Sequence, residues 1–159
     1  GIRKETCQII ACITARREQH IQAVLDNNMV PPLLQFVESE YTDIRMEAAR
    51  AVTNAISGGN SDQVKYLVQQ GCIPTLCNLL AIHDDPKIVM IALGALETIL
   101  KVGQEDAQQS ESHNNEMTVL VEQAGGLKGM KELGEFPNEN VASEKRTMIL
   151  ETYFGRTRG

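Results

Sequence analysis

One pattern recurs three times along the chain: the end of a short apolar helix, a polar or glycine-containing turn, and a new apolar run. The three copies occupy residues 24–34, 66–76 and 120–130. Val30 and Ile73, in two of the apolar runs, are 43 residues apart, and Ile73 and Leu127 are 54 apart. Residues 2–8 similarly align with residues 44–50, 42 positions further on. Copies of one unit must stack to bury their apolar faces, so this period limits the chain to a repeat architecture.

The spacing of apolar residues inside each copy is helical. In one long segment the apolar positions are Ile44, Ala48, Ala51, Val52, Ala55 and Ile56. They follow the i, i+3, i+4, i+7 rule of an amphipathic helix. β-Propeller blades share the period but need short strands with turns every ~8–12 residues. A period near 43 residues lies in the armadillo and HEAT range of about 40–47. We therefore predict an all-α, right-handed superhelical armadillo-repeat solenoid with three full three-helix repeats and one preceding helix.

The predicted solenoid covers residues 1–154. It divides into the third helix of a truncated repeat at 1–16, repeats at 17–59 and 60–103, an acidic loop at 104–116, a last repeat at 117–154, and a tail at 155–159. In the first full repeat we expect helices near 19–27, 30–38 and 42–57. Because the chain opens inside a long third helix, we expect a C-terminal fragment of a longer solenoid. The acidic segment reads as a solvated insertion, although its charge also suits a basic peptide or a mimic of phosphates.

Helix boundaries have their own signals. Pro31 and Pro74 fall in first turns, where a missing N–H costs little. The pair at 58–59 is Gly-Gly and should end the long helix. Asp43 and Asp85 are expected N-caps, the latter with a proline at the first helical position.

Composition excludes several classes of function. The net charge of −6, from 15 Lys and Arg against 21 Asp and Glu, argues against general binding to nucleic acid or anionic membranes. The sequence has neither an apolar run long enough to span a membrane nor an apolar signal-like start. Its three histidines lie far apart, and it contains no catalytic triad pattern, phosphate loop or metalloprotease motif. We expect no enzymatic activity and no cofactor.

The four cysteines are Cys7, Cys12, Cys72 and Cys77. A disulfide framework needs a secretory context, for which the sequence gives no sign. Cys72, Cys77 and His83 do not follow a zinc-binding spacing, and a fourth ligand is missing. We therefore expect reduced cysteines on helix faces and no metal.

Polar residues form a row opposite the apolar stripe of each long helix. The rows are Glu5, Gln8 and Cys12; then Glu47, Arg50 and Asn54; then Ile91, Gly94 and Thr98. Stacked repeats present one such helix each on a concave surface that suits an elongated partner. An Asn amide can donate and accept at once and so hold a peptide backbone, while the carboxylates would pair with Lys or Arg. The alternative is a merely solvated helix face.

Several short segments of the sequence resemble those of one protein family. Segments 2–7 (IRKETC), 44–49 (IRMEAA), 54–59 (NAISGG), 96–103 (LETILKVG) and 149–154 (ILETYF) resemble importin alpha, also called karyopherin alpha. The resemblance covers residues 2–154. It implies an adaptor of nuclear import, found in cytoplasm and nucleus, that binds Lys/Arg-rich nuclear localisation signals or cargo proteins along its groove. It further implies contacts with importin beta through an N-terminal region missing here, and with an export receptor and a nucleoporin through the C-terminal repeats.

The family's long helices carry a Trp and, four residues on, an Asn, and the part resembled here would hold the minor signal site. Gln8 and Arg50 stand at Trp positions and Cys12 at an Asn position, whereas Asn54, Glu5 and Glu47 keep the family's chemistry. The chain has no Trp. Lost cation–π stacking and the charge of Arg50 should weaken binding of a basic signal by at least about 2 kcal/mol, about 30-fold.

We therefore expect an adaptor fragment with a degraded minor site, whose peptide-binding residues are Glu5, Gln8, Cys12, Glu47, Arg50, Asn54, Gly94 and Thr98. The alternative is a docking module that binds a folded partner or the export receptor through its outer surface and last repeat. Exposed Tyr153 and Phe154 side chains would favour docking, whereas burial of both would make them a cap on the core.

Overall fold

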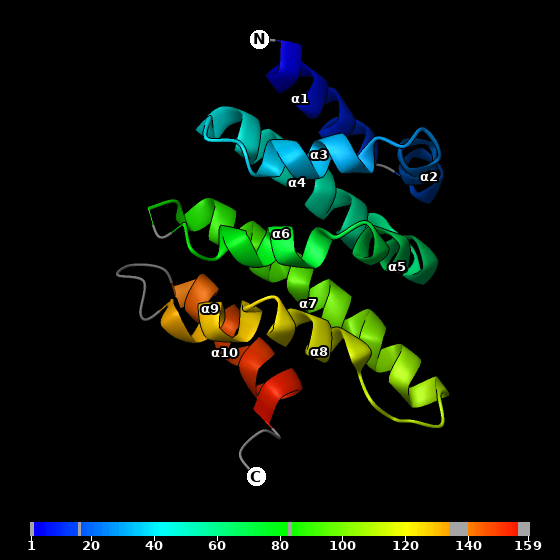
Figure 1. The fold of residues 1–159 in the computed structure, drawn as a ribbon, viewed down its shortest axis with the longest axis vertical. Helices are drawn as coiled ribbons and strands as arrows, with labels where there is room; N and C mark the ends of the chain where they lie inside the picture. The colour runs from blue at the N-terminus through cyan, green and yellow to red at the C-terminus, as the bar shows by residue number, and fades with distance from the viewer. Residues whose placement is uncertain (1, 16, 83, 134–139, 156–159) are drawn as a thin grey trace. The chain divides into compact units, whose positions relative to one another are not determined.

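A computed structural model describes residues 2–15, 17–82, 84–133 and 140–155, and within these residues every regular element is an α-helix (Figure 1). The helices are α1 (Ile2–Thr14), α2 (Glu18–Asp26), α3 (Val30–Val37), α4 (Thr42–Gly58), α5 (Ser61–Gln69), α6 (Cys72–Leu79), α7 (Pro86–Gln109), α8 (Glu116–Gln123), α9 (Gly126–Glu132) and α10 (Asn140–Phe154). The chain forms two compact units, Gly1–Thr75 and Leu76–Gly159, with α6 crossing the boundary between them. No helix in the described part of the chain combines the length and apolar character of a membrane span.

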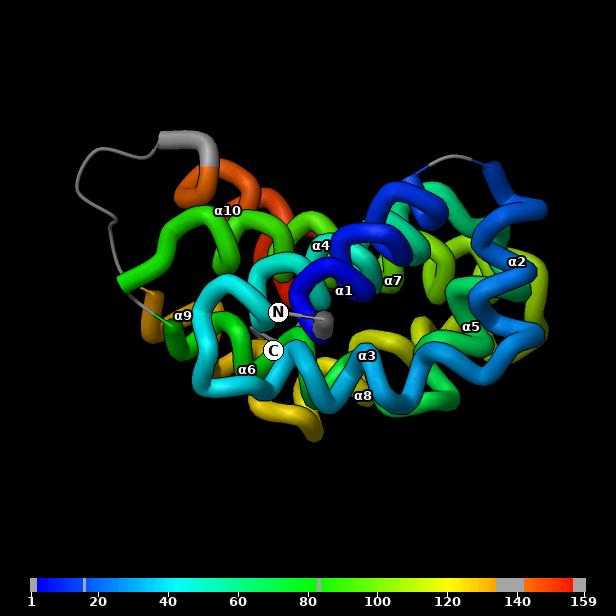
Figure 2. The backbone as a smooth tube through the Cα atoms, turned by 90° about the horizontal axis from the view of Figure 1, so that it is seen from above, coloured from blue at the N-terminus to red at the C-terminus, as the bar shows by residue number. Residues whose placement is uncertain are grey.

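The first unit contains the predicted three-helix repeat. Helices α2, α3 and α4 match the predicted segments to within a residue at each end. The most extensive contacts in this unit join α4 to α1 and to α3, and both views show α1 and α4 next to each other with α3 on one side of α4 (Figures 1 and 2). The all-α armadillo-type arrangement predicted from the period is confirmed.

The apolar stripe of α4 is made largely of small residues. The buried side chains of this helix include Ala48, Ala49, Ala51, Val52, Ala55 and Ile56. Alanine adds little bulk and has the highest helix propensity, so a neighbouring helix can approach closely without loss of helicity. Burial of this stripe against α1 and α3 removes its apolar surface from water, which is the main force holding the unit together.

The start of α4 differs from prediction. The helix begins at Thr42 with Tyr41 as the N-cap, and Tyr41 makes no side-chain capping bond. Asp43 therefore lies in the first turn rather than at the cap, where its Oδ1 accepts from the backbone N–H of Ile44 at 2.9 Å. A carboxylate in this turn still complements the positive end of the helix dipole.

The glycine pair at the end of α4 acts through close approach. Gly58 is the last helical residue, and Gly59 is the C-cap with an ordinary extended backbone, φ −79° and ψ 157°. A Cβ at Gly59 would lie 2.6 Å from the carbonyl oxygen of Ala55. The predicted helix stop is confirmed, and the backbone at position 59 has room for glycine but not for a side chain.

A buried amide fixes α5 on α2. Asn60 and Gln63 form a reciprocal capping box at the start of α5. Gln63 is 4% exposed, and its Nε2 donates to the carbonyl oxygen of Glu18 at 2.9 Å and to Oε1 of Gln22 at 3.0 Å. The Gln63 amide thus helps to cap one helix and also bonds to the other, which sets their relative register.

In the second unit, α7 is longer than predicted. Asp85 is the N-cap, its side chain accepting from Ile88 N–H, and Pro86 is the first helical residue, as expected. The helix then continues to Gln109, so the predicted loop at 104–116 is wrong for its first six residues and for Glu116, which begins α8. Residues 104–109 are Gln, Glu, Asp and Ala, mostly good helix formers that can extend a packed helix without an apolar stripe of their own. The predicted tail at 155–159 lies outside the described residues except for Gly155.

The extended end of α7 is anchored at Gly103. Asn115 caps α8 by accepting from Met117 N–H at 3.0 Å, and its Nδ2 donates to the carbonyl oxygen of Leu100 in α7 at 2.9 Å. A Cβ at Gly103 would collide with the Asn115 side chain and lie 2.8 Å from Cβ of Met117. Gly103 therefore allows α8 to sit directly on α7.

We expect Gly103→Ala to lower the free energy of unfolding by about 1–3 kcal/mol, because the new methyl group must displace Asn115 and Met117. Denaturant unfolding followed by circular dichroism measures the change. Gly94→Ala is the matched control in the same helix, since a Cβ there would meet only the Lys145 Nζ atom at 3.9 Å. That variant should gain about 0.5–1 kcal/mol from helix propensity. Equal effects of the two substitutions would contradict the packing role of Gly103.

Candidate functional site

Two of the predicted polar rows lie on neighbouring helices of the first unit. Helices α1 and α4 pack side by side and carry the α1/α4 polar surface, which consists of Glu5, Gln8, Cys12, Glu47, Arg50 and Asn54. Every α1 member of this surface is exposed, as is Arg50, whereas Glu47 and Asn54 are partly buried. The surface therefore offers exposed and half-buried polar groups from two neighbouring helices, as an elongated ligand requires.

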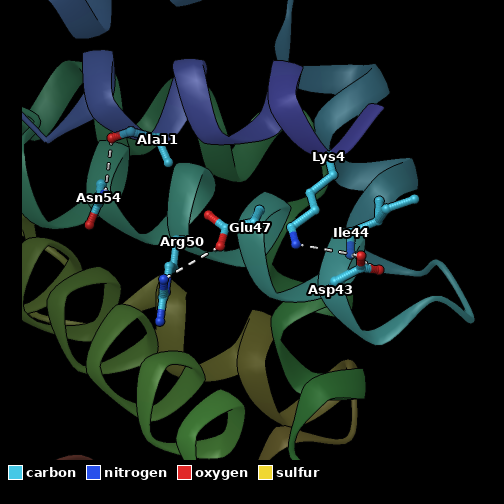
Figure 3. A network of polar contacts seen from close by, with 7 residues as sticks. All are labelled: Lys4, Ala11, Asp43, Ile44, Glu47, Arg50 and Asn54. Carbon is cyan, nitrogen blue, oxygen red and sulfur yellow. Dashed lines mark hydrogen bonds and ion pairs between the residues drawn. The ribbon is translucent and has the colours of Figure 1, made fainter. Parts of the chain in front are cut away.

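The charges of Glu47 and Arg50 are paired with each other. Their Oε1 and Nη1 atoms are 3.5 Å apart, one helical turn along α4 (Figure 3). The Glu47 side chain is 15% exposed and that of Arg50 is 51% exposed, so the guanidinium covers the carboxylate on the solvent side. Burial and the charge of Glu47 both raise the pKa of the Cys7 thiol on α1. The one negative charge that α4 contributes to the surface is thus offset within the same helix.

The Asn54 amide is bound to the neighbouring helix. Its Nδ2 donates to the carbonyl oxygen of Ala11 at 3.2 Å (Figure 3). An Asn amide has two N–H donors and one oxygen acceptor, so this bond commits one donor and leaves the oxygen and the second N–H to a ligand. Asn54 thereby combines a structural bond with the chemistry that could hold a peptide backbone.

A second inter-helix contact lies near the start of both helices. Lys4 Nζ is 3.7 Å from Oδ2 of Asp43, and the two side chains are 38% and 57% exposed (Figure 3). A pair this open to solvent contributes at most about 1 kcal/mol to stability. Its main effect is on charge, because it neutralises Asp43 next to the polar surface.

The third row lies on α7, in the second unit, and has different chemistry. Ile91, Gly94 and Thr98 are all partly buried. The Thr98 hydroxyl donates to the carbonyl oxygen of Gly94 at 3.2 Å, so it is turned back onto its own helix. At this row, Lys145 of α10 forms an ion pair with Glu97 at 2.8 Å, each side chain 30% exposed. Glu97 and Lys145 are not marked by any local sequence pattern, because their pairing depends on the register of α10 on α7.

The aromatic side chains at the end of α10 pack inward. Phe154 is 5% exposed, and Tyr153 is half-buried. Burial, followed by the charges of Glu97 and Glu105, raises the pKa of Tyr153. The large apolar side chains with high exposure in the described residues are Ile9, Tyr41, Val119, Leu120 and Met148, which are scattered over separate segments.

Possible metal ligands are dispersed among the described side chains. No group of three or more His, Cys, Asp or Glu residues gathers there as a ligand set would. Cys7, Cys12, Cys72 and Cys77 are all free thiols, and only Cys12 is exposed. Burial raises the pKa of Cys77 to about 12, so this thiol is protonated near neutral pH and makes a poor metal ligand.

The Armadillo/beta-catenin-like repeat family matches residues 17–57 and 60–101. Importin subunit alpha-5 of Arabidopsis thaliana is 39% identical over 153 residues, which are 96% of this chain and 29% of the relative. Importin subunit alpha-4 of the same plant is 41% identical over 155 residues, 97% of this chain and 28% of the relative. Importin subunit alpha of Saccharomyces cerevisiae is 42% identical over 94 residues, 59% and 17% of the two chains. The chain thus spans less than a third of the length of these relatives.

Solved structures give the same fold. A designed armadillo repeat protein in complex with the peptide (KR)4 has a TM-score of 0.74 at 26% identity, covering 94% of this chain and 57% of that one. A second designed armadillo repeat protein has a TM-score of 0.76 at 24% identity, with 94% and 57% covered.

We expect Asn54→Ala to lower the free energy of unfolding by about 0.5–1.5 kcal/mol, because the hydrogen bond to Ala11 between α1 and α4 is lost. Urea denaturation measures the change. Asn54→Asp is the matched variant, since it keeps the shape of the side chain but replaces the N–H donors by oxygen. It should destabilise at least as much, and full stability of Asn54→Asp would show that the bond contributes nothing.

Cys12 should be the one thiol that reacts in the folded protein, because the other three are buried. Treatment with a maleimide at neutral pH should add one label per chain, located by mass spectrometry of peptides. The remaining thiols should react only after denaturant is added. Labelling of Cys7 at the rate of Cys12 would contradict the tight packing of α1 on α4.

Proposed function

Because this chain belongs to the armadillo-repeat family and is importin alpha-like along almost all of its length, we propose that it is part of a nuclear import adaptor. Its role is to bind, not to catalyse: the α1/α4 polar surface takes an extended Lys/Arg-rich peptide of the nuclear localisation signal class. The observation that supports this proposal is the packing of α1 on α4, because these two helices carry the Glu5–Gln8–Cys12 and Glu47–Arg50–Asn54 rows.

Each group on the surface has a part in this proposal. The Glu5 and Glu47 carboxylates attract the basic side chains of the peptide, and the uncommitted atoms of the Asn54 amide bond to its backbone. One of the structural neighbours is a complex with (KR)4, an alternating basic peptide of the class proposed for this chain. The net charge of −6 adds a long-range attraction that speeds association.

The same surface is a weakened version of a signal site. Gln8 and Arg50 offer no indole against which a Lys or Arg stem can stack, and Cys12 cannot replace an Asn amide. Arg50 also forms an ion pair with the Glu47 carboxylate at 3.5 Å. A cation of the peptide therefore has to compete with Arg50 for this carboxylate. We therefore propose a degraded minor site that binds basic signals weakly and depends on other repeats of the adaptor for most of its affinity.

The proposal extends to the wider cycle of such an adaptor. The protein would move between cytoplasm and nucleus, and bind importin beta, an export receptor and a nucleoporin through regions that include, for the latter two, the repeats of this chain. A docking module for a folded partner is less well supported, because Phe154 is buried and Tyr153 is half-buried, so neither provides the exposed aromatic side chain that docking favours.

We expect the double variant Gln8→Trp/Arg50→Trp to bind a fluorescein-labelled (KR)4 peptide about 30-fold more tightly than the unchanged chain. The two indoles would supply about 2 kcal/mol of cation–π stacking, and Glu47 would be released from its ion pair. Fluorescence anisotropy measures both dissociation constants. Bound peptide should also slow maleimide labelling of Cys12 in the unchanged chain.

Two controls define the failure of this proposal. Gln19→Trp places an indole on an exposed residue of α2, away from the surface, and should leave the affinity unchanged. Glu47→Ala in the unchanged chain should weaken binding. If the double variant binds no better than Gln19→Trp, the α1/α4 polar surface is not a signal site, and a folded partner becomes the next candidate.

A further inference from the structure

The ion pair between Lys145 and Glu97 is short and well sheltered for a surface contact. Its N–O distance of 2.8 Å is that of a charge-assisted hydrogen bond. Each side chain is 30% exposed, whereas the Lys128–Glu132 pair of the same unit lies at 3.7 Å with side chains 81% and 61% exposed. Glu97 is thus paired with a cation from a different helix, in a partly desolvated position where competition from water is reduced.

The ammonium group of Lys145 also lies over the α7 row. A Cβ built on Gly94 would have the Lys145 Nζ atom as its only neighbour outside its own helix, at 3.9 Å. Gly94 stands 44 residues after Arg50 and so holds the same place in its repeat. The end of Lys145 thus lies above Gly94, at a distance that is ordinary van der Waals contact for a Cβ at that position.

A second carboxylate, that of Glu105, acts together with Glu97 on the side chain of Tyr153. The nearby Tyr153 has its pKa raised by burial first and then by the charges of Glu97 and Glu105. These carboxylates would attract a cation of a bound peptide to this face of α7. The position beside Glu97, however, is already taken by Lys145.

We propose that Lys145 is a specificity-determining residue, an internal occupant of the place on α7 that a basic side chain of a bound peptide would take. This inference rests on the proposed function, since it concerns the same class of ligand. Lys145 neutralises Glu97 and fills the space above Gly94, so a basic residue at this place meets like charge. In the first unit Arg50, which holds the place of Gly94 in its own repeat, likewise pairs with a carboxylate, that of Glu47, at 3.5 Å. A basic peptide side chain is therefore bound less tightly at α7 than it would be if Glu97 were unpaired.

The test is a gain of affinity on removal of the lysine. Lys145→Gln should bind fluorescein-labelled (KR)4 about five-fold more tightly than the unchanged chain, as expected when a peptide cation replaces the internal one beside a partly buried carboxylate. Lys128→Gln is the matched control, because it makes the same change in net charge at an exposed pair of the same unit. It should leave the affinity unchanged. Equal gains in the two variants would show a non-specific effect of net charge and overturn the proposal.

A double variant tests whether the gain in peptide affinity comes from the Glu97 carboxylate. Lys145→Gln/Glu97→Gln should lose the gain, because the carboxylate that would bind the peptide is gone. Circular dichroism melts establish that each variant is folded, and Lys145→Met, which keeps most of the aliphatic stem, replaces Lys145→Gln if the latter is not. No gain in a folded Lys145 variant, or a gain that survives in the double variant, overturns the proposal. This test can fail independently of the test of the α1/α4 polar surface. If Lys145→Gln gains affinity but Gln8→Trp/Arg50→Trp does not, only the α1/α4 polar surface is rejected as a signal site. If the tryptophan variant gains affinity but Lys145→Gln does not, only the role of Lys145 is rejected.

Discussion

Side-by-side packing of long helices is the contact on which the other features of this chain depend. In the first unit α1 covers one side of α4, and in the second α10 packs on α7. The alanines of α4 allow close approach while the larger aliphatic residues fill the space between helices. In the first unit this packing places the helix that carries Glu5, Gln8 and Cys12 beside the helix that carries Glu47, Arg50 and Asn54. A packing requirement of the core therefore creates the surface on which binding is proposed.

The charges on these faces are largely satisfied inside the chain. Glu47 is paired with Arg50, Asp43 with Lys4, and Glu97 with Lys145. An acidic row that is neutralised in this way has less to offer a cation at short range, although the net charge of −6 still attracts one from a distance. Differences in affinity between basic peptides would then depend on which of these ion pairs within the chain a peptide can break.

The sequence was most informative where one local rule decides the outcome. The i, i+3, i+4, i+7 pattern predicted α2 to α4 to within a residue, and Asp85 followed by proline predicted the start of α7. The sequence was misleading at 104–109, where helix propensity extends α7 without any apolar periodicity. It was also misleading at Asp43, which was expected to cap α4 but is its second helical residue, two positions after the N-cap Tyr41. The Glu47–Arg50 contact follows from helical spacing alone. The Lys145–Glu97 and Asn54–Ala11 contacts each join two helices that are far apart in the sequence. They depend on the register in which those helices pack, which no local sequence pattern specifies.

The Asn54–Ala11 hydrogen bond has a consequence for how a ligand is received. A side chain that orders only when its partner arrives loses rotamer entropy at that moment, at a cost of about 0.5–1.5 kcal/mol. The Asn54 amide is already held by the backbone of α1 at 3.2 Å, so this entropy is lost when the helices fold together. The amide oxygen and the second N–H of Asn54 then have a fixed orientation before a ligand binds. They are preorganised to form hydrogen bonds with the N–H and C=O groups of a peptide backbone.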